Sequence, residues 1–189
     1  AGYGITGGVL AANGKVMIGT VGRAPGGNFI VALNAQTGAE EWRFNAIARP
    51  GEPGGSSWNG LTVNQRNGAS VWVPGSYDQT LDLAFFGPGQ TYDTGPLRIL
   101  SGSEGISNDG LYTDSTLAIN VTTGKLVWFF QHLPNDQWDY DWAFERQVLP
   151  LPVNGRTRPV VVTGGKQAIF DGMEADTGKY VFSFDLGLQ

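Results

Sequence analysis

The chain has 189 residues, 29 glycines, no cysteine and a formal net charge of −5 at pH 7. This length can bury one real hydrophobic core, and the lack of cysteine excludes disulfides, thiolate metal sites and a cysteine nucleophile. The acidic balance without a basic cluster argues against nucleic acid or an anionic membrane as a partner, and no apolar run approaches the roughly 20 residues of a membrane span. Sparse charge and abundant glycine favour a turn-rich, all-β protein.

Short strands and tight turns are predicted from the N-terminus onward. Segments 9–11 and 15–19 flank Asn13-Gly14, the strongest short hairpin signal. Further strands are predicted at 29–33, 40–44, 70–73, 82–86, 125–130, 160–165 and 168–170. Segments 70–73 and 82–86 are expected to pair, and residues 94–113 are expected to form an irregular excursion. No segment has the periodicity of an amphipathic helix.

One motif recurs three times, as a Thr-Gly turn followed four residues later by an aromatic side chain. The copies are Gly38 with Trp42, Gly124 with Trp128, and Gly178 with Phe182. The glycines are 86 and 54 residues apart, so a degenerate copy between the first two would give a mean period of about 47 residues. Such a period of strand-like units indicates a β-propeller, in which each small sheet buries its faces on its neighbours. The glycine supplies a left-handed position, and the tryptophan is expected to fill the gap to the next blade.

The segment 131–145, QHLPNDQWDYDWAFE, is the first candidate site. Asp139 and Asp141 are two residues apart, so an extended backbone would point both to one side, where they suit one hard cation. Repulsion and loss of water are expected to raise the pKa values of these crowded carboxylates unless a cation compensates. The alternative is an irregular loop whose aspartates cap backbone amides. His132 is expected to be structural.

A Pro/Gly-rich loop over residues 46–60 is the second candidate site. It ends in GGSSWNG, and the small residues before Trp58 would let a flat ligand lie close to the backbone beneath the indole. A tryptophan in such a position is, on its own, more often part of the core.

Taken in order, these motifs resemble those of the quinoprotein alcohol dehydrogenases, eight-bladed propellers that carry pyrroloquinoline quinone (PQQ) and a metal ion. The matching pieces are the repeat to Trp42, GEPGGSSW (51–58), FFGPGQ (85–90), NDQWDYD (135–141), and Lys166 thirteen residues before Lys179. The resemblance implies that residues 1–189 form a single partial propeller domain of about four blades. It would be a fragment of a longer parent chain that contributes the remaining blades.

The resemblance also implies roles for five residues. Trp58 would form the floor on which the quinone ring stacks, and Lys166 would stabilise charge beside the quinone oxygens. Asp139 would be a metal ligand and the general base that takes the substrate hydroxyl proton. Gln90 stands where the family usually has an asparagine ligand. Asp141 resembles the extra acidic residue of the lanthanide-dependent branch, with Ca²⁺ as the other candidate ion.

One departure from the family pattern concerns the metal site. The family's metal-binding glutamate falls at Arg23 or Ala24, and neither side chain can replace a carboxylate. Either Asp141 supplies the lost charge, or metal binding is weak or absent. Arg23 could instead contact a carboxylate of the quinone.

Two functions of different classes are therefore expected from the sequence. The first is a periplasmic PQQ-dependent dehydrogenase that oxidises an alcohol, sugar or aldehyde and passes electrons to cytochrome c or a similar acceptor. The second is a cofactor-free propeller used as a binding or assembly scaffold, similar to outer-membrane assembly lipoproteins that share these repeats. The fold alone does not decide between them. The dehydrogenase requires Trp58, Asp139, Asp141 and Lys166 to converge on one axial cavity.

Overall fold

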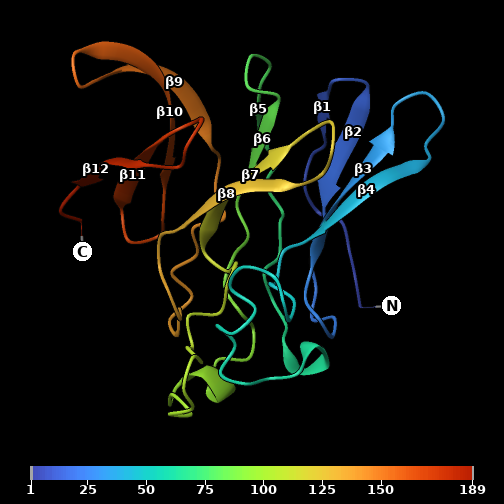
Figure 1. The fold of residues 1–189 in the computed structure, drawn as a ribbon, viewed down its shortest axis with the longest axis vertical. Coiled ribbons are helices and arrows are strands. Elements are labelled where there is room, and N and C mark those ends of the chain that lie inside the picture. The colour runs from blue at the N-terminus through green and yellow to red at the C-terminus, as the bar shows by residue number, and fades with distance from the viewer. Residues whose placement is uncertain (1, 189) are drawn as a thin grey trace.

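The computed structural model describes residues 2–188 and contains three four-stranded antiparallel sheets (Figure 1). The first sheet comprises β1 (Leu10–Ala12), β2 (Lys15–Gly19), β3 (Phe29–Asn34) and β4 (Glu40–Asn45). The second comprises β5 (Ser76–Asp78), β6 (Leu83–Phe86), β7 (Ser115–Asn120) and β8 (Leu126–Gln131). The third comprises β9 (Gln147–Val153), β10 (Arg156–Gly164), β11 (Ile169–Glu174) and β12 (Tyr180–Asp185). Each strand pairs with its neighbours in chain order, as in the blades of a propeller.

The sheets gather at one end of the molecule, and long loops fill the other end (Figure 1). Residues 2–188 contain two helical elements, both single 3₁₀ turns, η1 (Val63–Gln65) and η2 (Gly95–Leu97). None of the helices described is long and apolar enough to cross a membrane. The predicted all-β propeller architecture is therefore confirmed.

The number of blades is lower than the sequence suggested. Residues 2–188 form three sheets, whereas about four blades were expected, and no sheet lies between the first two Thr-Gly turns to supply the degenerate copy. The 86-residue spacing is instead one blade step enlarged by two long excursions, which cover residues 46–75 and 87–114. A mean period cannot distinguish a missing repeat from an insertion within one repeat.

Two strand predictions also need correction. Segment 70–73 is not a strand, and β6 pairs with β5 and β7 instead. Strand β9 was not predicted, because its sequence QVLPLPV contains two prolines. Proline is tolerated on an edge strand, where one row of backbone amides has no ladder partner, and β9 lies at the edge of the third sheet.

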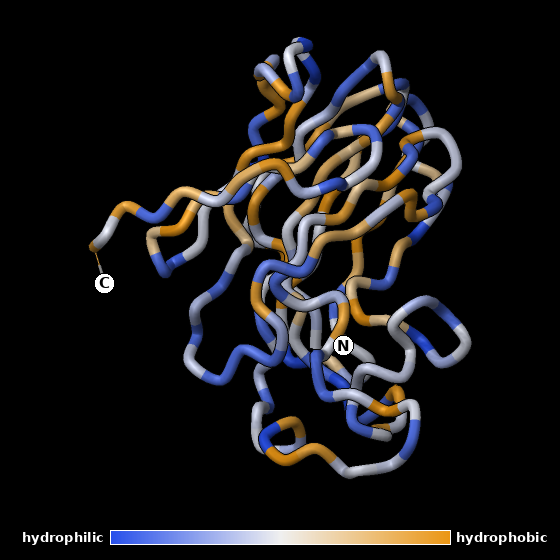
Figure 2. Tube along the Cα trace, turned by 60° about the vertical axis from the view of Figure 1, so that its left-hand side comes forward, coloured by the Kyte–Doolittle hydropathy of each residue, from blue (hydrophilic) through white to orange (hydrophobic). Residues whose placement is uncertain are grey.

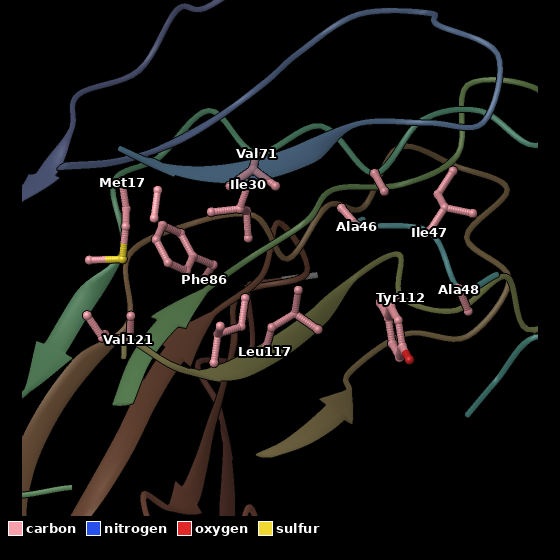
Figure 3. Close-up of a cluster of buried hydrophobic side chains, with 14 of the residues drawn as sticks. Met17, Ile30, Ala46, Ile47, Ala48, Val71, Phe86, Tyr112, Leu117 and Val121 are labelled. Atoms are coloured by element: carbon pink, nitrogen blue, oxygen red, sulfur yellow. The ribbon is translucent and has the colours of Figure 1, made fainter. Parts of the chain in front are cut away.

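The main core lies between the first and second sheets. Figure 3 shows Met17 and Ile30 of the first sheet facing Phe86 and Leu117 of the second, and all four side chains are buried. The loop residues Ala46 to Ala48 and Tyr112 extend this core toward the loop end. Along the tube in Figure 2, hydrophobic residues follow the strands and hydrophilic residues collect at the hairpin tips and in the loops. The alternation of side chains across each strand thus gives every sheet a face for its neighbour.

The second and third Thr-Gly turns each receive a tryptophan from the preceding sheet, as the repeat predicted. A Cβ added to Gly124 would lie 2.5 Å from Cγ of Trp42, and one added to Gly178 would lie 2.6 Å from Cδ2 of Trp128. The Trp42 indole donates a hydrogen bond to Val121 O at 2.9 Å, and the Trp128 indole donates one to Ala175 O at 3.0 Å. Neighbouring sheets are therefore joined by one repeated contact, which requires glycine because of both φ and space.

Candidate active site

Four of the five predicted site residues meet at the loop end of the molecule. The Lys166 ammonium lies 3.0 Å from Asp139 Oδ1 and 2.7 Å from Asp141 Oδ2. Gln90 donates through Nε2 to Asp139 Oδ1 at 2.8 Å and through its backbone N–H to Asp141 Oδ1 at 3.0 Å. Three segments far apart in sequence thus bring two carboxylates, an amine and an amide to one point. We call these four residues the Lys166 cluster.

Asp139 reaches the cluster through an unusual backbone conformation. Its φ is 64°, in the left-handed region, so the extended backbone predicted for 139–141 is wrong. Asp136 forms the base of this turn, since its carboxylate accepts hydrogen bonds from the backbone N–H of Trp138 at 2.8 Å and of Tyr140 at 2.7 Å. The capping role considered for the aspartates of this loop therefore holds for Asp136, which is buried. Asp139 caps no backbone amide of this turn, and its side chain points outward to Gln90 and Lys166.

The two carboxylates of the cluster differ in exposure and in pKa. Asp139 is open, with 64% of its side chain exposed, and its hydrogen bond to Lys166 lowers its pKa below the ordinary aspartate value. Asp141 is 7% exposed, and loss of water raises its pKa although Lys166 and the Gln90 amide oppose this rise. At neutral pH the exposed carboxylate is thus an ionised base, while the buried one fixes the amine.

Trp58 does not join the cluster. It is 1% exposed and belongs to the hydrophobic core, and its indole N–H donates to Leu111 O at 2.5 Å. This placement contradicts its predicted role as the floor of the quinone site, because a ring enclosed by core residues offers no free face to a ligand. The small residues before it serve close packing instead, since a Cβ on Gly55 would lie 2.3 Å from Arg49 O.

Trp72 is an aromatic residue that the structure places beside the cluster in place of Trp58. A Cβ on Gly89 would lie 2.7 Å from the Trp72 ring and 2.7 Å from Asp141 Oδ1, so the indole edge and the carboxylate both flank the residue before Gln90. Trp72 is half-buried. Small residues precede it in the sequence, Gly68-Ala69-Ser70, the same signal that drew attention to Trp58. The backbone of Gly68 and Ala69 runs against Gln90, whose carbonyl accepts the Ala69 N–H at 2.9 Å.

The residues present suit a hard cation in ligand type. Asp139, Asp141 and Gln90 offer carboxylate and amide oxygens, the donors that calcium and lanthanide ions prefer. Among residues 2–188 no three His, Cys, Asp or Glu side chains are placed so that they could hold a metal ion together. Arg23 is exposed, and its guanidinium lies 5.3 Å from the ring centre of Tyr92, two residues beyond Gln90. Lys166 supplies part of the positive charge that the carboxylates need.

Comparison with known proteins places the chain in a family. Residues 4–185 match the family model for the PQQ glucose/ethanol/alcohol dehydrogenase β-propeller domain. The dehydrogenase subunit of a quinone-dependent alcohol dehydrogenase from Gluconobacter oxydans (strain 621H) is 36% identical over 95% of this chain and 25% of the relative. Quinohemoprotein alcohol dehydrogenase ADH-IIG of Pseudomonas putida is 32% identical over 94% of the chain and 26% of the relative.

Solved structures agree with this placement. A quinohemoprotein alcohol dehydrogenase from Pseudomonas putida HK5 superposes with a TM-score of 0.84 at 29% identity, over 97% of this chain and 28% of that one. A europium-containing methanol dehydrogenase gives a TM-score of 0.81 at 25% identity, over 96% of this chain and 34% of that one. The chain spans about a quarter of the length of the curated relatives it matches. This chain belongs to the family of PQQ-dependent glucose/ethanol/alcohol dehydrogenase β-propellers.

Proposed function

We propose that the full-length protein oxidises an alcohol, sugar or aldehyde with PQQ as electron acceptor, and that the Lys166 cluster is part of its active site. The observation that carries the proposal is the convergence of Gln90, Asp139, Asp141 and Lys166 from three separate segments. Family membership supplies the chemical context. Passage of electrons to cytochrome c or a similar acceptor, and a periplasmic location, belong to the same proposal.

The cofactor and ion would be held by residues around Gln90. Trp72 offers a half-buried indole beside Gly89 on which a flat quinone can stack, and this residue takes the role first considered for Trp58. When bound, PQQ supplies the carbon that accepts a hydride from the substrate. Asp139, Asp141 and the side-chain amide oxygen of Gln90 would hold a calcium or lanthanide ion, and Lys166 would stabilise negative charge on the reduced ring.

Asp139 is the residue proposed to take the substrate's hydroxyl proton. Its exposed carboxylate can reach a bound alcohol, and its lowered pKa keeps it ionised at neutral pH. Gln90 and Lys166 fix one of its oxygens, Oδ1, which leaves Oδ2 to face a substrate. The buried Asp141 has no comparable access, so we assign it to holding Lys166 and an ion.

The cofactor-free scaffold remains the second candidate, because Arg23 stands where the family's metal-binding glutamate is expected and Lys166 already neutralises part of the cluster. The two candidates differ in whether the protein binds quinone. Titrating the full-length apo-protein with PQQ in the presence of Ca²⁺ or La³⁺, and following the quinone absorbance, separates them.

We expect saturable binding of PQQ to the wild-type protein. Binding should be weaker in Trp72→Ala and unchanged in Trp138→Ala. Trp138 is the matched control because it is 77% exposed and lies near the cluster in sequence. Absence of binding with either ion would leave the scaffold as the function.

A further inference from the structure

A buried imidazole lies under the loop that carries the two aspartates. His132 directly follows β8, its side chain is 0% exposed, and both ring nitrogens are engaged. Nδ1 lies 2.6 Å from Asp171 Oδ2 on β11, and Nε2 lies 2.8 Å from Thr116 Oγ1 on β7. The hydroxyl of Ser183 on β12 donates to the other oxygen of Asp171 at 2.5 Å. The imidazole is therefore anchored by the second and third sheets together.

Each proton in this network can be assigned. The guanidinium of Arg146 donates through Nε to Thr116 Oγ1 at 3.2 Å, so the Thr116 hydroxyl is free to donate to His132 Nε2. His132 then donates from Nδ1 to the Asp171 carboxylate. Burial lowers the pKa of His132 to about 4, which keeps the ring neutral at pH 7. The imidazole thus has one tautomer and one orientation.

The chain of aspartate, histidine and hydroxyl has the order of an acyl-transfer triad, but it cannot act as one. Thr116 is fully buried, and its oxygen already accepts a hydrogen bond from Arg146. A nucleophile needs access to a substrate. The network must therefore serve another residue.

Besides an edge contact with Phe130, the imidazole stacks on Trp142. The His132 and Trp142 rings are parallel, with an interplanar angle of 2° and 4.3 Å between their centres. On the indole's side, Gly165 approaches so closely that a Cβ there would lie 2.4 Å from Cε2 of Trp142. The Trp142 backbone N–H donates to the buried Asp114 Oδ1 at 3.1 Å. The indole is thus in contact with both the His132 ring and the backbone of Gly165.

Trp142 and Gly165, which contact each other, are each next in sequence to a residue of the Lys166 cluster. Asp141 immediately precedes Trp142, and Lys166 immediately follows Gly165. The backbone N–H of Lys166 is shared between Tyr140 O and Asp141 O, each at 3.2 Å. A shift of the indole would therefore move the carboxylate and the amine that face each other at 2.7 Å.

We propose that His132, held by Asp171, is a positioning residue that fixes the Asp139–Lys166–Asp141 geometry by stacking on Trp142. The inference rests on the proposed function for its catalytic consequence and on the structure alone for its mechanical one. The stack attaches the loop over 136–142 to the sheets. The distances from the Lys166 ammonium to the carboxylates of Asp139 and Asp141 are therefore kept during turnover.

Two variants of His132 separate the contribution of the ring stacking from that of the hydrogen bonds. His132→Gln keeps groups that can hydrogen-bond but has no ring, whereas His132→Phe keeps a ring but cannot hydrogen-bond. Trp128→Phe is the control, since it removes the indole hydrogen bond to Ala175 at a blade interface away from the cluster. All three are made in the full-length protein, and their thermal stabilities are measured so that activity is compared at a temperature where each is folded.

Hydrogen–deuterium exchange of the Trp142 and Lys166 amides is the first readout, and it requires no cofactor. We expect His132→Gln to speed exchange at both amides by about tenfold or more and Trp128→Phe to stay close to wild type. His132→Phe should speed exchange by a smaller factor than His132→Gln, because it keeps the ring but loses the hydrogen bonds to Asp171 and Thr116. The second readout is steady-state kinetics with PQQ and metal bound, in which His132→Gln should lower kcat by roughly tenfold with little change in KM.

Unchanged exchange at both amides in His132→Gln would overturn the inference, and so would equal exchange and kcat effects in the Gln and Phe variants. If His132→Phe does not fold, the comparison of His132→Gln with Trp128→Phe decides. A wild-type protein that binds no quinone would remove the proposed function, and the exchange result would still decide the role of His132.

Discussion

The sheets and the loop end of this molecule are held together in different ways. Between sheets, apolar side chains interlock, and one contact repeats, with a tryptophan of one blade over a glycine of the next. At the loop end, hydrogen bonds from buried polar side chains hold the segments together. Arg66 donates to Leu61 O and Gly55 O at 3.0 Å each, and the side chain of Asn28 donates to Gly22 O at 2.9 Å and Gly68 O at 2.8 Å.

The difference shows why the site lies where it does. A repeated apolar contact tolerates many sequences of the right size and period, so it defines the blades but offers no special chemistry. A buried polar contact must be satisfied individually, and it fixes loops that have no ladder of their own. The Lys166 cluster belongs to the second kind of region, where each side chain is set by particular partners.

Removal of the Arg146 side chain should have the largest effect on stability. The buried guanidinium donates to Ser115 O at 2.9 Å and also to Trp142 O, Phe144 O and Thr116 Oγ1, beneath the aspartate loop. Arg146→Met leaves these acceptors without a donor, so we expect the free energy of unfolding to fall by about 3 kcal/mol or more.

Urea denaturation of the full-length protein measures this change. Arg156→Met, at an exposed position on β10, is the control and should change stability by less than about 0.5 kcal/mol. Equal effects of the two substitutions would show that the loop end does not depend on its buried polar contacts.

A matched pair of glycine substitutions tests the repeated contact between blades. Gly124 and Gly155 have nearly the same φ, 71° and 76°, but only Gly124 lies against a tryptophan ring. Alanine at either position costs about 1 kcal/mol because of φ alone. Gly124→Ala should cost about 2 kcal/mol beyond this, because the added methyl displaces the Trp42 indole. Equal melting temperatures for the two variants would contradict the docking account.

The pH dependence of turnover tests the electrostatics of the cluster. The proposed base, Asp139, must be ionised to accept a proton, so activity is expected to fall as the pH drops through its pKa. Its hydrogen bond to Lys166 is the largest cause that lowers this pKa. In Lys166→Met the pKa should rise, and the acid limb of kcat/KM should move to higher pH. An acid limb that stays in place, or moves to lower pH, would show that Asp139 is not the base whose titration limits turnover.

The sequence was most informative where a pattern reports directly on geometry. The Thr-Gly turns with their tryptophans predicted the propeller and the way in which blades meet. The ordered motifs also predicted that Gln90, Asp139, Asp141 and Lys166 belong together, and the structure brings them into contact.

Where one pattern has two physical causes, the sequence was misleading. Small residues precede both Trp58 and Trp72, but they permit tight packing in the first case and flank the cluster in the second. Only the three-dimensional course of the loops separates the two. The stack of His132 on Trp142 likewise depends on Asp171, 39 residues away, and no local signal announces it.

The most direct test of the central claim is a single-turnover measurement on Asp139. The full-length protein is loaded with PQQ and Ca²⁺ or La³⁺, an alcohol is added, and the change of the quinone absorbance on reduction is followed in wild type and in Asp139→Asn. Because Asp139 is exposed, the variant should retain fold and quinone binding, while its rate of reduction should fall by about 10³-fold. Reduction at the wild-type rate in Asp139→Asn would contradict the assignment of the Lys166 cluster as the site of proton removal.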